Sequence, residues 1–511
     1  MSLDVAGRTA AGGDGGPAPA RTSGAPSRGR PVVAAVAGVG ILAGLASAAS
    51  PVLGVAVVVV VVLAALSVLR PDDVSVLIVA VIYSNAVVVA TQLHGVPRVF
   101  AVGVPVALAV PLAHRLLVRR QPLVIVRALP VLVVFGAIQA ASTLGAVTPG
   151  VSIDKMAEFL TEGLALFLLV TNTVVGADQV RRAVWALLFV GGALGALSLL
   201  QSVTGTYGQD YLGFAQISDA TVGVESDPTA AVPRLAGPIG ETNRYAQVML
   251  VLFPLGLVQA LGGATRRVRL LSAVATALIA TGVVLTFSRG AAVGLAVVLV
   301  VAVAMRILKV RWLLLVAGCL AAVLPFVPAY AQRLATLGEV ADAGNPFASR
   351  GVDGAIQGRL SENLSALAAM REHPLLGVGP GGFPSVYQRY VRDLGIRPHE
   401  GEREAHNLYV GTGAELGLLG LACFLAVVAV VLRDLLRARR LLAATDPGTA
   451  TLAAGFVLAL VAHLASGLFL HQAFQRYFWL LLALAACAAA VAQVRAGPTN
   501  PAATPRPGRP D

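Results

Sequence analysis

The chain has 511 residues and a formal net charge of +12, and 57% of its residues are hydrophobic while only 13% are charged. A water-soluble chain carries roughly 25% charged residues, and the apolar residues here gather in runs of about 20, the length that crosses a hydrocarbon core. The composition therefore excludes a soluble enzyme or binding domain, and whether the positive charge marks nucleic-acid binding depends on where the basic residues lie.

Low-complexity tails flank a long series of apolar runs. Residues 1–31 are rich in Gly, Ala, Pro, Ser and Arg, and residues 497–511 have the same character, so we expect two disordered tails. The N-terminal tail has no evident small-residue cleavage site and is interpreted as retained cytoplasmic sequence. Candidate spans lie near residues 32–49, 51–69, 73–92, 98–117, 123–145, 157–176, 182–204, 243–262, 268–286, 290–306, 311–330, 407–432, 449–470 and 476–494. We predict an all-α, polytopic transmembrane bundle of about 12–14 spans.

The basic residues of the short junctions fall in phase with these spans. Alternate junctions carry Arg70, Arg115, Arg119, Arg120, Arg127, Arg181, Arg182, Arg266, Arg267, Arg269, Arg306, Lys309, Arg311, Arg433, Arg437, Arg439 and Arg440. The opposite junctions carry Arg98, Arg289 and Arg476. By the positive-inside rule, we expect a multi-pass membrane protein with both termini cytoplasmic. The basic excess is then an orientation signal, and no nucleic-acid partner is expected.

This topology predicts the domain organisation. Transmembrane helices are expected at 32–330, interrupted by an outer loop at 205–242, and again at 407–496. Between them lies a large extracytoplasmic loop, residues 331–406, in which Leu360, Leu364, Leu367 and Met370 recur at helical spacing and predict a helix over 359–371. The three cysteines lie in apolar runs without metal-ligand spacing, so neither a disulfide framework nor a zinc site is indicated.

Four polar stretches converge on the expected outer face. Residues 237–245 (Gly-Pro-Ile-Gly-Glu-Thr-Asn-Arg-Tyr) open a span, with Thr242 or Asn243 as the expected cap. Arg244 fits a simple helix start badly, because a cation at a helix N-terminus opposes the dipole. Residues 286–290 (Thr-Phe-Ser-Arg-Gly) form a tight turn that holds Arg289 at the lipid boundary, where its guanidinium faces either lipid headgroups or a polar cavity.

The other two stretches lie in the large outer loop and at its end. Residues 358–383 contain Arg359 and a glycine-rich segment, 377–382, that is either a simple turn or a cradle of backbone N–H groups for an anion. Residues 404–409 (Glu-Ala-His-Asn-Leu-Tyr) place His406 at a helix N-terminus, where the dipole favours a neutral imidazole that can accept a proton. An interfacial histidine that merely caps the helix is the alternative. Glu415, farther along this helix, is expected to serve helix packing.

In this order the four stretches resemble the O-antigen ligase and O-antigen polymerase family of bacterial membrane glycosyltransferases. The resemblance covers residues from about 237 to 425. It implies transfer of a glycan from an undecaprenyl-diphosphate carrier to a glycan or lipid acceptor hydroxyl at the outer face, without a nucleotide sugar, metal or other cofactor. It further implies His406 as general base and Arg289 and Arg359 as catalytic residues that also bind the lipid diphosphate. Arg244 is our own addition to that binding set, from its position.

Polymerisation and ligation of a cell-envelope polysaccharide both remain open. The alternative from another class is a polysaccharide transporter or lipid-linked glycan flippase, but transporters bind substrate near the bilayer midplane. Here the mid-span polar residues are scattered, whereas the charges concentrate outside. A second alternative is a metal-dependent polyprenyl-phosphate-sugar transferase, which would place an acidic residue in its first outer loop. The junction at 49–50 is Ala-Ser and has no acid, so this alternative loses most of its support.

Overall fold

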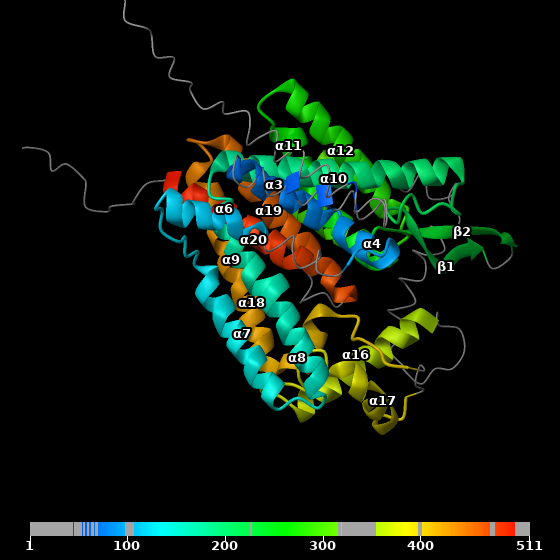
Figure 1. The fold of residues 1–511 in the computed structure, drawn as a ribbon. Helices are drawn as coiled ribbons and strands as arrows, with labels where there is room; N and C mark the ends of the chain where they lie inside the picture. The colour runs from blue at the N-terminus through cyan, green and yellow to red at the C-terminus, as the bar shows by residue number, and fades with distance from the viewer. Residues whose placement is uncertain are drawn as a thin grey trace, which may run out of the picture. The chain divides into compact units, whose positions relative to one another are not determined.

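Helices make up almost all of the regular structure in the computed structural model of the protein (Figure 1). It describes residues 70–97, 107–224, 227–314, 354–396, 401–470 and 476–495, with isolated positions before residue 70 and at 318. The first half contains α3 (Pro71–Tyr83), α4 (Ala86–Leu93), α6 (Ala109–Ala113), η1 (His114–Val118), α7 (Ala128–Leu144), α8 (Pro149–Glu158), η2 (Phe159–Ala165), α9 (Leu166–Thr173) and α10 (Ala177–Thr204). The second half contains β1 (Gln216–Val224), β2 (Asp227–Gly237), α11 (Thr242–Gly262), α12 (Arg266–Val284), α13 (Arg289–Ala304), α16 (Gly354–Glu372), α17 (Phe383–Asp393), α18 (Leu408–Leu442), α19 (Pro447–Ser466), η4 (Gly467–Phe469) and α20 (Arg476–Arg495).

The expected all-α polytopic fold is confirmed. Among the described residues, six helices are long and apolar enough to cross a membrane, or seven if the bent pair of α3 and α4 is one span. That pair bends by 52° where Asn85 takes a left-handed conformation, with φ of 60°. Apart from isolated positions, the spans expected at 32–49 and 51–69 lie outside the described residues, as do residues 98–106 of the span expected at 98–117 and most of the span expected at 311–330. The description that follows concerns the compact unit Val62–Asp511.

Helix α18 runs between two ends of the helical bundle. Its first residue, Leu408, packs against Gly467 of η4, where an added Cβ would lie 2.8 Å from the leucine side chain. Near its other end, Arg439 donates a 2.6 Å hydrogen bond to the carbonyl of Met305, just after α13. His406 precedes the start of α18, and Asp434 lies well beyond its break at Gly417. We call these the His406 end and the Asp434 end.

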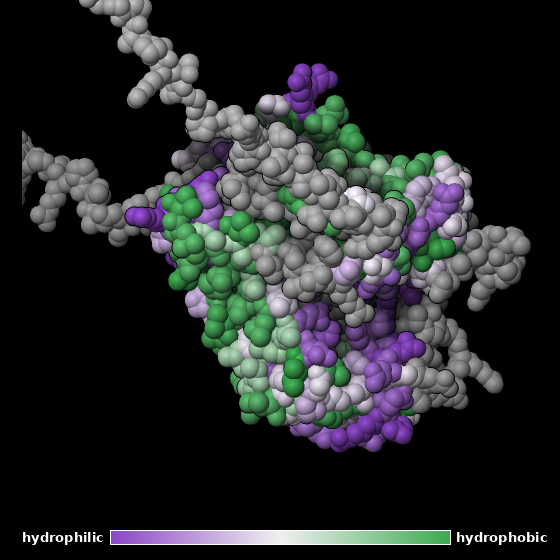
Figure 2. Space-filling model, viewed as in Figure 1, coloured by the Kyte–Doolittle hydropathy of each residue, from purple (hydrophilic) through white to green (hydrophobic). Residues whose placement is uncertain are grey.

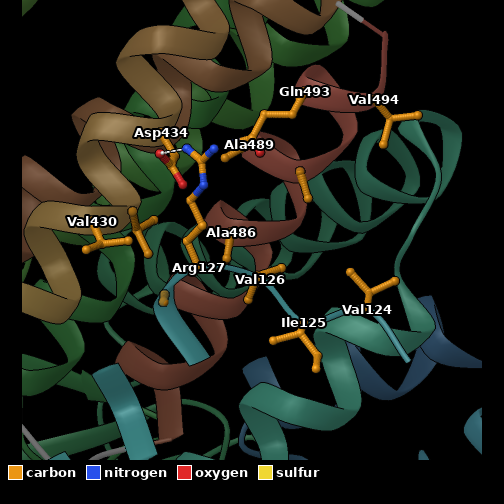
Figure 3. A pocket seen from close by; sticks show the side chains of 13 residues that line it. Val124, Ile125, Val126, Arg127, Val430, Asp434, Ala486, Ala489, Gln493 and Val494 are labelled. Atoms are coloured by element: carbon orange, nitrogen blue, oxygen red, sulfur yellow. Dashed lines mark hydrogen bonds and ion pairs between the residues drawn. The ribbon is translucent and has the colours of Figure 1, made fainter. Parts of the chain in front are cut away.

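Arginine–carboxylate pairs fasten the helices at the Asp434 end. Arg127, just before α7, lies 3.2 Å from Asp434, whose side chain is only 8% exposed (Figure 3). The pair borders a cavity of about 260 Å³ whose other walls are mostly aliphatic side chains preceding α7 and on α18 and α20. Arg119 pairs with Asp72 of α3 in the same way, at 3.2 Å. Both arginines come from junctions that are predicted to lie on one side of the membrane. These junctions therefore supply ion pairs between helices at the Asp434 end.

An antiparallel β-hairpin stands where the sequence predicts only an outer loop at 205–242. Strands β1 and β2 pair from Gln216 with Gly237 to Val224 with Asp227, with register shifts between them. The base of the hairpin is tied to the bundle, since the N–H of Leu235 donates to the carbonyl of Leu285 at 3.4 Å. The hairpin thus reaches the turn that links α12 to α13.

Helices α16 and α17 form a smaller apolar cluster of their own. Ala366 and Ala369 of α16 are fully buried against α17 residues, with Tyr387 also 0% exposed. The helix expected over 359–371 is therefore present, within α16. Figure 2 shows hydrophilic residues gathered over α16 and α17, whereas hydrophobic residues cover the side formed by α7 and α9. Such an apolar side suits contact with lipid tails.

Candidate functional site

His406 is held between two buried apolar neighbours. Ala405 is 2% exposed and belongs to the α16–α17 cluster, while Leu408 is 0% exposed and belongs to the main core. Asn407 caps α18, its Oδ1 accepting hydrogen bonds from the N–H groups of Tyr409 at 3.0 Å and Val410 at 3.2 Å. Because the backbone is anchored on both sides and capped, the position of the His406 ring is well defined.

Glu362 contacts the imidazole of His406 directly. The distance from Glu362 Oε2 to His406 Nδ1 is 2.6 Å, and the Glu362 side chain is 4% exposed whereas that of His406 is 34% exposed. The carbonyl oxygen of Glu404 lies 3.2 Å from the same nitrogen. The histidine is thus held from its Nδ1 side. Sequence reasoning missed Glu362, which resembles the other acids of the outer loop until its burial is known.

Arg244 reaches the same segment from α11. Its Nη2 lies 3.0 Å from Glu404 Oε2, two residues before His406. Glu241 caps α11 in place of the expected Thr242 or Asn243, accepting from the N–H groups of Asn243 at 3.0 Å and Arg244 at 2.7 Å. The unfavourable position of this cation at a helix start is therefore offset by two carboxylates.

Arg289 is the first residue of α13 and is buried, with 8% exposure. The turn before it is tight: Phe287 has a φ of 51°, and Ser288 caps the helix by accepting from the N–H of Ala291 at 3.4 Å. A guanidinium that extended to lipid headgroups would be largely exposed. Its burial favours the protein-lined polar environment over the interfacial alternative.

Arg234 of β2 connects the two arginine-bearing stretches and was not singled out from the sequence. It is 6% exposed, its Nε donates to the carbonyl of Thr286 at 3.0 Å, and its Nη2 donates to Asn243 Oδ1 at 3.1 Å. One buried side chain thus holds the residues next to Arg244 and those before Arg289. No local pattern marks it, because both contacts depend on the unpredicted hairpin.

The turn η4 places the Arg289 stretch and the His406 stretch side by side at one end. Gly467 lies against Leu408, and a Cβ added at Gly290 would lie 2.9 Å from Phe469 Cβ. The same three-residue turn therefore contacts the residue after Arg289 and the helix that begins after His406. Three predicted stretches are brought together, the third being that of Arg244.

Arg359 belongs to this neighbourhood through α16. It precedes Glu362 by three residues, a spacing that puts two side chains on one face of a helix with Cβ atoms about 5–6 Å apart. The side chain is half-buried. Arg359 therefore lies one helical turn from the carboxylate that holds His406.

The glycine-rich segment fills a break in α18. At Gly417 the helix has φ of 67° and ψ of −173°, and the N–H groups of Val378 and Gly379 donate to the carbonyls of Ala414 and Glu415, both at 3.0 Å. In return, the N–H of Leu418 donates to the carbonyl of Pro374 at 2.8 Å. These N–H groups are used inside the protein, so the segment is a structural turn and not an anion cradle.

We expect Gly417→Ala to destabilise the protein by about 3 kcal/mol or more. The conformation is one that essentially only glycine adopts, at a cost of order 1–3 kcal/mol for other residues. An added Cβ would also lie 2.3 Å from the backbone of Leu375. Thermal unfolding of the purified protein should show a clear drop in melting temperature. The matched control is Gly413→Ala, whose added Cβ would meet only the flexible Met370 side chain at close range. Equal stability of the two variants would contradict the close packing of the glycine-rich segment against the break in α18.

Among the residues that the structure describes, no three His, Cys, Asp or Glu side chains are grouped so that they could hold a metal ion. The donor groups that do gather at the His406 end are guanidiniums, namely those of Arg234, Arg244, Arg289 and Arg359. Guanidiniums offer paired N–H donors and a permanent charge, which suits recognition of phosphate oxygens. Beside them stands one imidazole with a carboxylate on its Nδ1. Groups of these kinds are chemically suited to bind a phosphorylated anion and to accept a proton.

Residues 274–425 match the family model described as O-antigen ligase. This segment is similar in sequence to the O-antigen ligase family. The matched segment runs from within α12 to within α18 and contains Arg289, Arg359, Glu362 and His406, whereas Arg234 and Arg244 precede it. This similarity indicates a membrane transferase that acts in cell-envelope polysaccharide synthesis on lipid-linked glycans. A comparison with curated proteins found no match.

Proposed function

We propose that the protein transfers a glycan from undecaprenyl diphosphate to an acceptor hydroxyl at the outer face of the bacterial plasma membrane, as a polysaccharide polymerase or ligase. The observation that carries this proposal is the packing of the His406 stretch and the Arg289 stretch on the same turn, η4. A base and an anion-binding group at one helix-bundle end are what displacement of a lipid diphosphate requires.

In the proposed reaction the acceptor oxygen attacks the anomeric carbon of the donor glycan. His406 Nε2 takes the proton of the acceptor hydroxyl, a contribution typically worth 10²- to 10⁴-fold in rate. The bond from the anomeric carbon to the diphosphate oxygen breaks, and its electron pair leaves with undecaprenyl diphosphate. Arg289 and Arg359, with Arg244 beside them, offset the negative charge that develops on this leaving group. The arginines would thereby supply the charge stabilisation that a metal ion provides in other transferases.

The sidedness of this proposal rests on the distribution of arginine. The Asp434 end carries the arginine-rich junctions, including Arg127 and Arg119, and cytoplasmic loops are enriched in such residues. The His406 end would then face the outside, with both termini in the cytoplasm. Carrier-linked glycans completed at the inner face would have to be moved across the membrane by a separate flippase before they reach this site.

The test is covalent transfer in detergent, where no membrane separates two compartments. Purified protein is mixed with undecaprenyl-diphosphate-linked oligosaccharides extracted from the cells that produce it, in the presence of EDTA. We expect longer or newly linked glycans together with free undecaprenyl diphosphate. A flippase would leave the donor chemically unchanged in detergent and would move it only across vesicle membranes, and that outcome would overturn the proposal.

A further inference from the structure

Two acceptor oxygens face the same nitrogen of His406. Glu362 Oε2 lies 2.6 Å and the Glu404 carbonyl oxygen 3.2 Å from Nδ1. Neither a carboxylate nor a carbonyl can donate, so Nδ1 must carry the hydrogen in both contacts. In the neutral ring the other nitrogen, Nε2, then holds the lone pair. The surroundings of the ring thus select the tautomer that can act as a base at Nε2.

The turn of α16 that carries Glu362 is held by contacts of the neighbouring serines. Its neighbour Ser361 hydrogen-bonds the carbonyl of Gly358 at 2.8 Å and lies 3.1 Å from the hydroxyl of Tyr387 on α17. Ser365, one turn on, is fully buried. A carboxylate that is 4% exposed must be compensated by a partner, since burial of an unpaired charge is costly. His406 is such a partner, and the charge of Glu362 would stabilise the imidazolium formed when the ring takes a proton.

We propose that Glu362 is the positioning residue of the site, holding His406 in the Nδ1–H tautomer with Nε2 directed to the acceptor hydroxyl. This inference rests on the proposed function, and it assigns a role to a residue that neither the family resemblance nor the charge pattern had assigned. Glu362 does not touch the reacting atoms; it acts through the imidazole. The proton of the hydroxyl passes to Nε2, and the Nδ1 hydrogen stays between the ring and Glu362.

If Glu362 served only to pack α16 against the start of α18, the two variants Glu362→Gln and Glu362→Asp would be expected to behave differently. Glutamine has nearly the same volume as glutamate and preserves packing, whereas aspartate leaves a small cavity. If Glu362 selects the tautomer of His406, aspartate should preserve activity better than glutamine. The amide introduced by Glu362→Gln can turn its N–H₂ group to Nδ1 and favour the Nε2–H tautomer, which cannot accept a proton at Nε2, whereas Glu362→Asp keeps a charged acceptor.

The experiment compares Glu362→Gln, Glu362→Asp and His406→Ala in the transfer assay, with Glu372→Gln as control. Glu372 lies on the same helix but pairs with Arg389 at 2.8 Å, away from His406. In Glu362→Gln we expect kcat to fall by about 10²- to 10⁴-fold, with little change in KM for the donor. Glu362→Asp should retain part of kcat, and the control Glu372→Gln should retain all of it. Nitrogen-15 NMR of histidine-labelled protein should show the His406 ring moving from Nδ1–H toward Nε2–H in Glu362→Gln.

The outcomes separate this inference from the proposed function. Near-normal kcat in Glu362→Gln while His406→Ala is inactive would overturn the positioning role and leave the function standing. Near-normal transfer by His406→Ala would overturn the role of His406 as base, and with it the positioning role of Glu362, whereas no transfer by the unaltered protein would overturn the function itself. Greater activity in Glu362→Gln than in Glu362→Asp, with no change in tautomer, would show a packing role and also overturn the inference.

Discussion

His406→Ala is expected to reduce glycan transfer by about 10²- to 10⁴-fold, the usual contribution of a general base. The variant removes the imidazole that Glu362 holds, but the backbone around it stays anchored by Ala405 and Leu408, which are buried. The protein should therefore insert in the membrane and accumulate normally. The measurement is product formed per amount of protein in the detergent assay.

His373→Ala provides the matched control for that variant. His373 follows α16 in the same outer segment, and its side chain is 38% exposed beside Glu372. Its loss should leave the rate within about twofold, since exposed side chains away from a site change little. Equal losses in the two variants, or near-normal product from His406→Ala, would contradict the role of His406.

Arg289→Ala is the second variant with a large expected effect. A buried guanidinium that offsets charge on a leaving diphosphate contributes most in the transition state, so kcat should fall by about 10²- to 10³-fold, the size of comparable electrostatic contributions. Arg289→Lys should recover only part of the rate, because an ammonium lacks the paired N–H donors of a guanidinium. Initial rates over a range of donor concentrations separate kcat from KM.

Arg392→Ala is a suitable control for the loss of one positive charge from the same face. Arg392 lies on α17, and its Nε hydrogen-bonds the carbonyl of Gln388 one turn back at 3.0 Å. We expect normal rates from it. Full activity of Arg289→Ala, or full rescue by lysine, would show that Arg289 serves only to place α13 in the bundle.

The sequence predicts those parts of this protein that depend on local pattern. Apolar runs of membrane length predict the all-α polytopic fold, and the turn at residues 286–290 is short enough to be recognised directly. His406 and Arg289 became candidates because each stands at a helix start, and their proposed roles came from the family resemblance. The count of spans predicts only that both lie on the outer face, and their packing against η4 is known from the structure alone.

The remaining features depend on contacts between distant segments. Glu362 is one of many outer-loop acids, and only the folded structure shows that it is buried beside His406. Arg234 acquires its two partners from the hairpin, whose irregular register no periodic pattern marks. Gly417 sits in an apolar helical run, and it is a backbone segment some forty residues earlier that opens the helix there. None of these effects can be read from neighbouring residues.

A cryo-EM map of the protein with bound undecaprenyl diphosphate would test most directly whether one site contains both the base and the guanidiniums. We predict density for the diphosphate at the His406 end, in contact with Arg289 and next to the Nε2 side of the His406 ring. Density for the diphosphate at the Asp434 end, or at a place where packed helices separate it from His406, would contradict the proposed site.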